Sequence, residues 1–173
     1  MGKTVIEIGL NTKDINRAIK EIEKYKQDML TKLETFRKRL ADEISAEAQS
    51  GFGSAVVDDL IRGGFRSPEV AVSVTDKGNV SVVIADGKDA VFVEFGTGVY
   101  HNGSVGSSPH PKGAELGYTI GSYGKGYGKG KAWGYIEDGE LKITRGTPTA
   151  MPMYNAMKSV ISKAESIARE VWN

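Results

Sequence analysis

The chain of 173 residues contains no cysteine, which excludes disulfide bonds and metal sites built on thiolates. It also lacks an apolar run near the roughly 18 residues that a membrane-spanning helix needs. Excess charge is missing as well, since 23 basic residues stand against 22 acidic ones, so nucleic-acid binding by the whole surface is not expected. Glu7 interrupts the first apolar run, so we expect no signal peptide and predict a protein made in the cytoplasm.

Glycine is abundant, but its excess is local. Twelve of the 22 glycines fall between Gly96 and Gly134, and the rest of the chain has an ordinary composition. The length suits one domain with its own core. We therefore predict a single domain over residues 1–173 that carries a flexible Gly-rich loop at residues 99–131.

The N-terminal part predicts a short strand followed by a very long helix. Residues 3–10 alternate as a strand does, and Asn11 and Thr12 can cap the helix that follows. The apolar residues of that helix recur at spacings of three and four and so form a stripe along one side: Ile15, Ile19, Ile22, Met29, Leu33, Phe36, Leu40, Ile44 and Ala48. Such a helix, ending before Gly51, would be about 55 Å long. A small domain cannot cover all of its stripe, so we expect part of the stripe to contact a loop or another subunit; a coiled coil is the less favoured alternative.

Two hairpins are predicted to form a small antiparallel sheet. In the first, Val70, Val72 and Val74 alternate, as do Val80, Val82 and Ile84, with turn residues 76–79 between them, so we expect one packed face. In the second, residues 133–136 and 140–144 flank the turn 137–139.

Three further segments have helical character. Residues 51–68 resemble a turn with a short helix, and residues 89–95 favour a short helix that Asp89 could cap over the alternative of a strand. Pro152 suits the first turn of a final helix. The face predicted to be buried consists of Met153, Met157, Val160, Ile161, Ala164, Ile167, Ala168 and Val171. Together these elements predict an α+β fold with a long N-terminal and a C-terminal helix on the sheet.

Two short motifs carry a family resemblance. One is Val93-Glu94-Phe95-Gly96-Thr97, followed by Gly98, and the other is Ala150-Met151-Pro152-Met153 at the start of the last helix. The chain resembles the head–tail joining, or tail-completion, proteins of long-tailed bacteriophages, in which a V-E-F-G-T-like segment precedes a variable loop and an A-x-P-F-like turn starts the last helix. Met153 stands where that family usually has an aromatic residue. The order of the predicted elements resembles that of the family over residues 12–172.

The resemblance implies a structural phage or prophage protein of the virion neck, not an enzyme, with no cofactor and no metal. Copies would close into a ring, six-fold as tail-symmetric rings are, and would stack on a tail terminator or on a head-side adaptor or stopper. Assembly would take place in the bacterial host cytoplasm. A tail-terminator ring of the same fold remains an alternative.

The Gly-rich segment 121–131 does not fit a phosphate-binding loop. Tyr123 stands where a loop ending in Gly128-Lys129 needs its first glycine, and Gly130 stands where serine or threonine belongs. Basic and aromatic residues alternate there instead: Lys125, Tyr127, Lys129, Lys131 and Trp133. Such a loop could contact a phosphate backbone without reading sequence, so a non-specific nucleic-acid-binding module is another alternative. A solvated segment that orders against a neighbouring subunit is favoured over DNA contact.

Glu94 is the acid that most requires an explanation, because it lies within an apolar run. Burial of its charge would cost several kcal/mol unless it is paired or hydrogen-bonded. We expect a structural partner, either the backbone N–H groups of the turn 96–98 or a lysine or arginine near the C-terminal helix. An enzyme using Glu94 with His101 or His110 is the less favoured interpretation, because both histidines are expected in a solvated loop.

Overall fold

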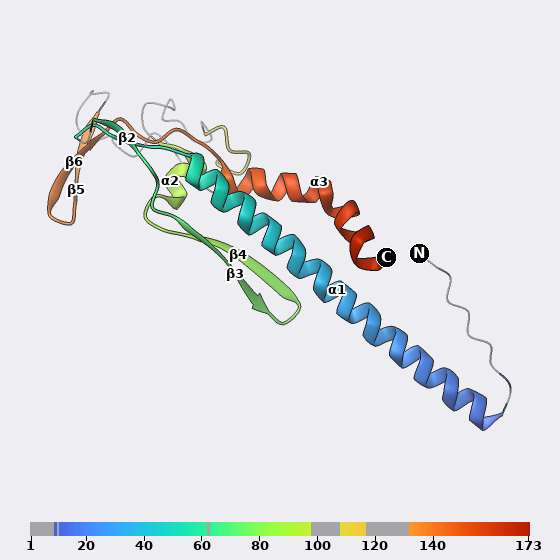
Figure 1. The fold of residues 1–173 in the computed structure, drawn as a ribbon. Helices are drawn as coiled ribbons and strands as arrows, with labels where there is room; N and C mark the ends of the chain where they lie inside the picture. Colours follow the sequence, from blue (N-terminus) through green and yellow to red (C-terminus); the bar gives the residue numbers. More distant parts are fainter. Residues whose placement is uncertain (1–8, 10, 62, 98–107, 117–131) are drawn as a thin grey trace.

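The computed structural model describes residues 9, 11–61, 63–97, 108–116 and 132–173, and its architecture is α+β as predicted. Helix α1 (Thr12–Ser54) runs the length of the molecule. Helix α3 (Pro152–Trp172) lies antiparallel along its C-terminal half, and the hairpin of β3 and β4 lies along another side of α1 (Figure 1). The predicted strand at residues 3–10 and most of the predicted loop at 99–131 lie outside the described residues.

Helix α1 begins where the sequence predicts and ends later. The Asn11 side chain accepts a hydrogen bond from the backbone N–H of Asp14 at 2.9 Å, as a helix cap should. The helix then spans 43 residues, about 65 Å, and continues through Gly51 to Ser54. The prediction that it stops before Gly51 is wrong because Phe52 lies in the core with only 2% of its surface exposed. Burial of that ring outweighs the roughly 1 kcal/mol that each glycine costs a helix.

The two glycines of this last turn predict opposite responses to alanine. A Cβ on Gly53 would meet nothing within 4 Å, whereas a Cβ on Gly51 would lie 3.0 Å from the Cβ of Pro152. We expect Gly53→Ala to raise the free energy of unfolding by about 0.5–1 kcal/mol, which is the helix-propensity difference. Gly51→Ala should lose that gain because α3 must move away. Urea unfolding of both variants measures this, and equal stabilisation by both would contradict the close approach of α1 and α3.

Residues 55–68 form a hairpin, not the predicted turn and short helix. Strand β1 (Val57–Asp59) pairs antiparallel with β2 (Gly64–Arg66), in the register Val57 to Arg66. Val57 enters the core beside Phe52. The spacing of the apolar residues in this segment is also typical of a helix. The chain instead reverses its direction, with Gly63 and Gly64 at the positive φ that such a reversal requires.

Strands β3 (Ala71–Lys77) and β4 (Val80–Asp86) form the predicted hairpin, but the face of β4 that packs against α1 is not the expected one. Val72 pairs with Ala85 and Val74 with Val83, so Val83 shares the face toward α1 with them. Side chains one position away point to the opposite face of the sheet. Three expected core residues of β4 therefore face away from α1: Val80, Val82 and Ile84.

The third hairpin, β5 (Trp133–Glu137) with β6 (Glu140–Thr144), confirms its prediction, with Asp138 and Gly139 both at positive φ in the turn. The expectation of one sheet made of two hairpins is wrong, because the described strands form three separate two-stranded sheets. An isolated hairpin is marginal in water, so each depends on its packing against helices or against other chains.

The two remaining helices follow the sequence more closely. Helix α2 (Ala90–Phe95) is the short helix favoured for residues 89–95, although Asp89 makes no capping bond. Pro152 starts α3 as expected, with Ala156, Val160 and Ile167 buried behind it. Two residues predicted to be buried are instead open to solvent: Met157 and Ile161, with 40% and 65% exposed.

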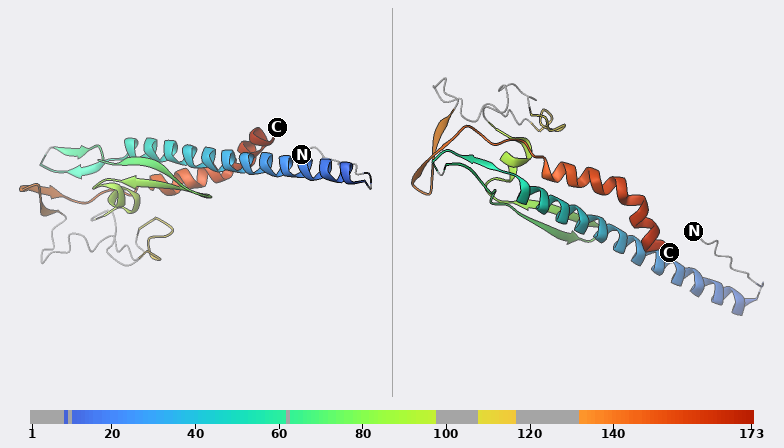
Figure 2. Two further views of the ribbon diagram at one scale, coloured as in Figure 1. Left: turned by 90° about the horizontal axis from the view of Figure 1, so that it is seen from below. Right: turned by 45° about the horizontal axis from the view of Figure 1, so that its top comes forward.

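The first part of α1 projects beyond the rest of the described molecule. The ring of Trp172, the last residue of α3, packs on Phe36 with the centroids 5.6 Å apart, and the tip of the β3–β4 hairpin lies near Leu33. From there to Thr12 no described element lies beside α1 (Figures 1 and 2). On the apolar stripe of that part Ala18 is buried, but Ile15, Ile19 and Ile22 are each 44–53% exposed.

Candidate functional site

The two motifs that carry the resemblance lie against each other. The backbone N–H of Ala150 donates to the carbonyl of Val93 at 2.9 Å, and the N–H of Thr97 donates to the carbonyl of Thr147 at 2.8 Å. The Thr97 hydroxyl oxygen accepts a further bond from the N–H of Thr147, also at 2.8 Å. The chain thus returns, about fifty residues later, to pair its backbone with the end of α2.

Glu94 anchors this junction from inside. It is 7% exposed, and one carboxylate oxygen accepts from the N–H of Met153 at 2.9 Å while the other accepts from the N–H of Tyr154 at 3.0 Å. Both N–H groups belong to the first turn of α3, where no helical carbonyl can reach them. Glu94 therefore supplies the cap that the N-cap residue Met151 lacks, and its negative charge lies at the positive end of the helix dipole. The expected structural role fits, but the partners differ from those expected: the N–H groups of Gly96 and Thr97 bond to Phe92 and Thr147, and no described lysine or arginine binds Glu94.

His110 is the third partner of Glu94. Its Nε2 lies 3.1 Å from Oε1 of Glu94, and its Nδ1 accepts from the N–H of Lys112 at 3.0 Å, so Nε2 carries the proton given to the carboxylate. The ring packs on Phe95 and Tyr154, with centroids 4.4 and 5.3 Å away. The prediction of a solvated loop histidine is wrong for His110, because the aromatic contacts and the carboxylate bury it. His101 lies outside the described residues.

The surrounding turn residues hold the junction in shape. Gly96 has φ 76°, a conformation that favours glycine, and its N–H ends α2 on the Phe92 carbonyl. The Phe95 carbonyl accepts from the hydroxyls of Ser108 and Thr149 at 2.7 and 2.9 Å. Pro152 occupies the first turn of α3 as predicted, while Gly98 lies outside the described residues.

Two buried ion pairs beside the junction were not predicted from the sequence. The Asp58 side chain is fully buried and accepts from the Arg145 guanidinium at 2.6 Å and from the Arg145 backbone N–H at 2.6 Å. Burial would raise the pKa of Asp58, but these bonds outweigh it and hold the pKa below its usual value. Asp89 binds Arg66 through both carboxylate oxygens, at 2.6 and 2.8 Å. Nothing in the local sequence marks these acids, because each partner is far along the chain.

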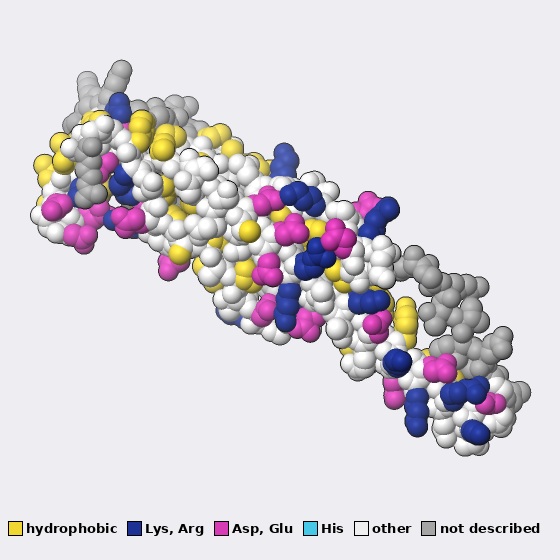
Figure 3. Space-filling model, viewed as in Figure 1, with side chains coloured by type: hydrophobic (Ala, Val, Ile, Leu, Met, Phe, Trp, Pro, Cys, Tyr) yellow, Lys and Arg dark blue, Asp and Glu magenta, His cyan; other side chains and the backbone are white. Residues whose placement is uncertain are grey.

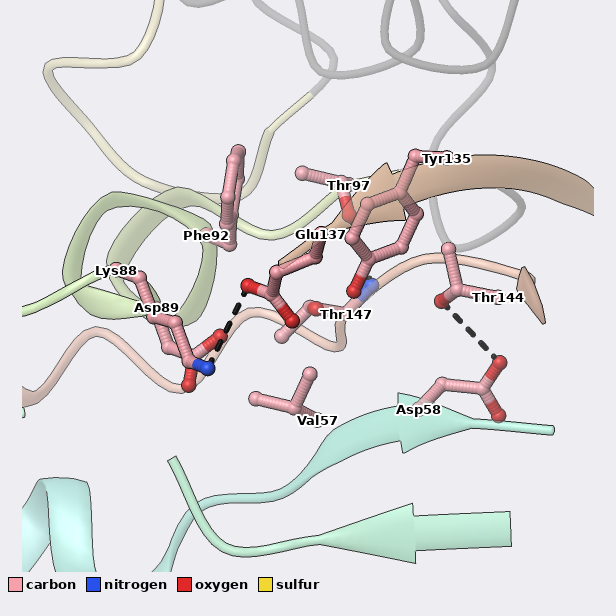
Figure 4. Close-up of a pocket in the computed structure, with 10 residues that line it drawn as sticks. All are labelled: Val57, Asp58, Lys88, Asp89, Phe92, Thr97, Tyr135, Glu137, Thr144 and Thr147. Carbon is pink, nitrogen blue, oxygen red and sulfur yellow. Dashed lines mark hydrogen bonds and ion pairs between the residues drawn. The ribbon is translucent and has the colours of Figure 1, made fainter. Parts of the chain in front are cut away.

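A cavity of about 180 Å³ lies where β1, α2 and the β5–β6 hairpin meet (Figure 4). Phe92 and Val57 line it with apolar side chains, and Tyr135 lies next to Glu137, whose carboxylate is 3.4 Å from the Lys88 ammonium. The volume is below the 300 Å³ typical of small-molecule pockets. Glu94 and His110 do not line this cavity.

The predicted contact loop is mostly outside the described chain. Lys125, Tyr127, Lys129 and Lys131 all lie there, and of Trp133 the backbone position at the start of β5 is described. On the face shown in Figure 3, basic and acidic side chains are interspersed along α1 without a continuous basic patch. That face offers no counterpart to a nucleic-acid backbone.

Neither a metal site nor a membrane span emerges from the described residues. In these ranges no three side chains of histidine, aspartate or glutamate are grouped to hold a metal ion. No described helix is both long and apolar enough to cross a bilayer. No family model matches the chain, and no curated protein or solved structure matches it either. The functional argument therefore depends on the residues themselves.

Proposed function

We propose that this protein is a structural component of a phage or prophage neck, which assembles into a ring that joins the tail to the head. Its mechanism is assembly, and its partners are further copies of itself and the neighbouring terminator, adaptor or stopper rings. The proposal locates the protein in the virion, after assembly in the host cytoplasm.

The observation that carries the proposal is the uncovered stripe on the projecting part of α1. Ile15, Ile19 and Ile22 lie on one side of the helix, and further along the same stripe Leu33 is 49% exposed. Aligned apolar residues of this kind are costly in water and mark a protein contact when they are contiguous. Three two-stranded sheets with open edges give further surfaces that a neighbouring subunit could complete.

The contact between the two motifs supports the same proposal. The acid of the first motif caps the helix that the second motif begins, which gives the resemblance a physical reason for needing both motifs together. A buried carboxylate whose two oxygens accept hydrogen bonds from three partners suits a structural junction better than a catalytic one. The tail-terminator alternative uses the same surfaces, and binding to isolated neck and tail proteins would separate the two roles.

Light scattering across a concentration series, followed by negative-stain imaging, tests the proposal. We expect the intact protein to form closed rings, alone or on addition of neck proteins. Replacing Ile15, Ile19 and Ile22 together by serine should abolish assembly and leave the helical circular dichroism signal of the folded body. The matched control replaces Glu21 and Lys24 by serine, which keeps the net charge and changes the opposite side of the same helix. Rings that survive the triple replacement, or no association with any neck or tail protein, would count against the proposal.

A further inference from the structure

The strand edge of β4, with the groove between it and α1, is a built surface for another strand. The side chains of Ser81 and Val83 face a groove of about 460 Å³ whose other wall is α1. That wall is mostly apolar, with Leu33, Phe36, Leu40, Ala41 and Ile44, and its one charged residue, Arg37, is bound to Ser81 and Asp76 of the hairpin. No residue of β3 lines the groove, so it opens past the β4 edge of the hairpin.

The hydrogen-bond pattern shows which backbone groups point out of this edge of the sheet, while Gln49 of α1 covers the beginning of the other edge. Gln49 of α1 accepts from the N–H of Val72 at 2.8 Å, so that N–H points away from β4. Val72 and its partner Ala85 are therefore a non-hydrogen-bonded pair. Because such pairs recur at every second residue, Val74 and Val83 are one as well. On β4 the outward-pointing backbone groups are then those of Ser81, Val83 and Ala85, and none of them bonds to another described residue outside the hairpin. An unpaired edge beside an apolar wall is the geometry that accepts an added strand.

We propose that residues 3–8 of a second copy of this chain add to the β4 edge and fill the groove. Their sequence, Lys-Thr-Val-Ile-Glu-Ile, alternates as a strand does. Ile6 and Ile8 share one face, which would cover Leu33 and Leu40, while Glu7 would face solvent. Backbone bonds to β4 would extend the two-stranded sheet to three strands, the number at which a sheet becomes stable.

Chain length excludes the same contact within one copy. Leu33 lies 21 residues after Thr12 along α1, which places it about 32 Å from the start of the helix. Between Asn11 and Ile6 a fully extended chain spans at most about 18 Å, and between Asn11 and Lys3 about 29 Å. The N-terminal segment therefore falls short of its own groove, and further short of the strand β4 beyond it. A neighbouring copy has no such limit.

This inference deepens the proposed function. It rests on that function only for how many copies the contact joins into one assembly. A segment donated at one end of α1 and received beside its middle makes a head-to-tail contact, which closes into a ring or continues as a chain. The uncovered residues Ile15, Ile19 and Ile22 of the donor follow directly after its strand, so they would lie close to the acceptor's hairpin and lose their exposure there.

Because the chain has no cysteine, single cysteines give an unambiguous test. Full-length Ile6→Cys carrying a size tag is mixed with untagged full-length Leu33→Cys and oxidised, so that a disulfide between the two species must join two copies. Leu33 is half exposed, and the replacement should leave the fold intact. The control partner is Ile161→Cys, which is 65% exposed on α3. We expect a tagged–untagged band at least tenfold stronger with Leu33→Cys than with Ile161→Cys. The band should be lost when Ile8, which shares the groove-facing side of the strand with position 6, is also replaced by aspartate.

Each outcome decides one of the two proposals. Equal bands with both partners, or none with Leu33→Cys, would overturn strand donation, and rings seen by negative stain in the same sample would leave the neck proposal standing. A specific crosslink in a sample that holds closed dimers only would support strand donation by reciprocal exchange and would remove the ring. Rings with the specific crosslink support both.

Discussion

Replacing Glu94 by alanine should lower the free energy of unfolding by about 3–5 kcal/mol. The substitution removes the cap of α3, worth about 1 kcal/mol, and leaves the buried Nε2–H of His110 without its acceptor, at about 1–3 kcal/mol. A small cavity adds to the loss. Urea unfolding followed by circular dichroism measures the change, and a loss below 1 kcal/mol would show that the junction does not depend on the carboxylate.

Two further variants separate the contributions at this junction. Glu94→Gln keeps the shape and one acceptor oxygen, so it should lose less than alanine, about 2 kcal/mol. Glu94 and His110 should show coupling in a double-mutant cycle, because they share one hydrogen bond. The matched control is Glu165→Ala on α3, the helix that Glu94 caps. The Glu165 side chain is 79% exposed in a pair with Arg169, so its replacement should cause no measurable loss.

The second large effect is expected at Asp58, as a dependence of stability on pH. Its pKa is held below the ordinary value in the folded state, so the stability it contributes is complete above the unfolded pKa of about 3.9 and is lost as the pH falls through the lower folded pKa. Asp58→Asn should lower the free energy of unfolding by about 3 kcal/mol at pH 7, because the fully buried group that accepts the hydrogen bonds of Arg145 loses its charge. Arg145 is 41% exposed and can be hydrated, which keeps the loss at the lower end of the range for buried pairs.

The measurement compares the two proteins between pH 7 and pH 2. The difference in unfolding free energy should be constant from pH 7 to about pH 5 and should shrink toward zero in acid, as the wild-type carboxylate takes up its proton. Asp28→Asn on α1, whose side chain is 56% exposed, is the control and should follow the wild-type curve. A difference that grows as the pH falls would contradict the direction of the pKa shift.

The sequence predicted the elements whose signals are local. The cap at Asn11, the three/four spacing of α1, Pro152 and the turn chemistry of two hairpins all depend on residues near one another in the chain. It failed where packing between distant segments decides. Gly51 and Gly53 remain helical because Phe52 reaches the core, and the register of β4 follows from which of its two apolar faces meets α1.

The junction between α2 and α3 was predicted only in part, again because its contacts join distant segments of the chain. Glu94 stood out because an acid within an apolar run needs a partner, but its partners lie 16 residues or more away, at His110 and at the start of α3. A histidine between two prolines gives no sign of burial. The ion pair of Asp58 with Arg145 joins residues 87 positions apart, and a single sequence offers no means to connect them.

The backbone pairing of Thr97 with Thr147 has a consequence for how such a chain can diversify. It closes the chain on itself, so that all residues between the two threonines form a detour whose ends meet at one fixed point. The cost of closing a loop grows slowly with its length, by about 0.6 kcal/mol per doubling. His110 and Arg145 bind Glu94 and Asp58 and must keep their places. Elsewhere the detour could gain or lose many residues while the helices stay where they are, so its length can change at little cost to the stability of the fold.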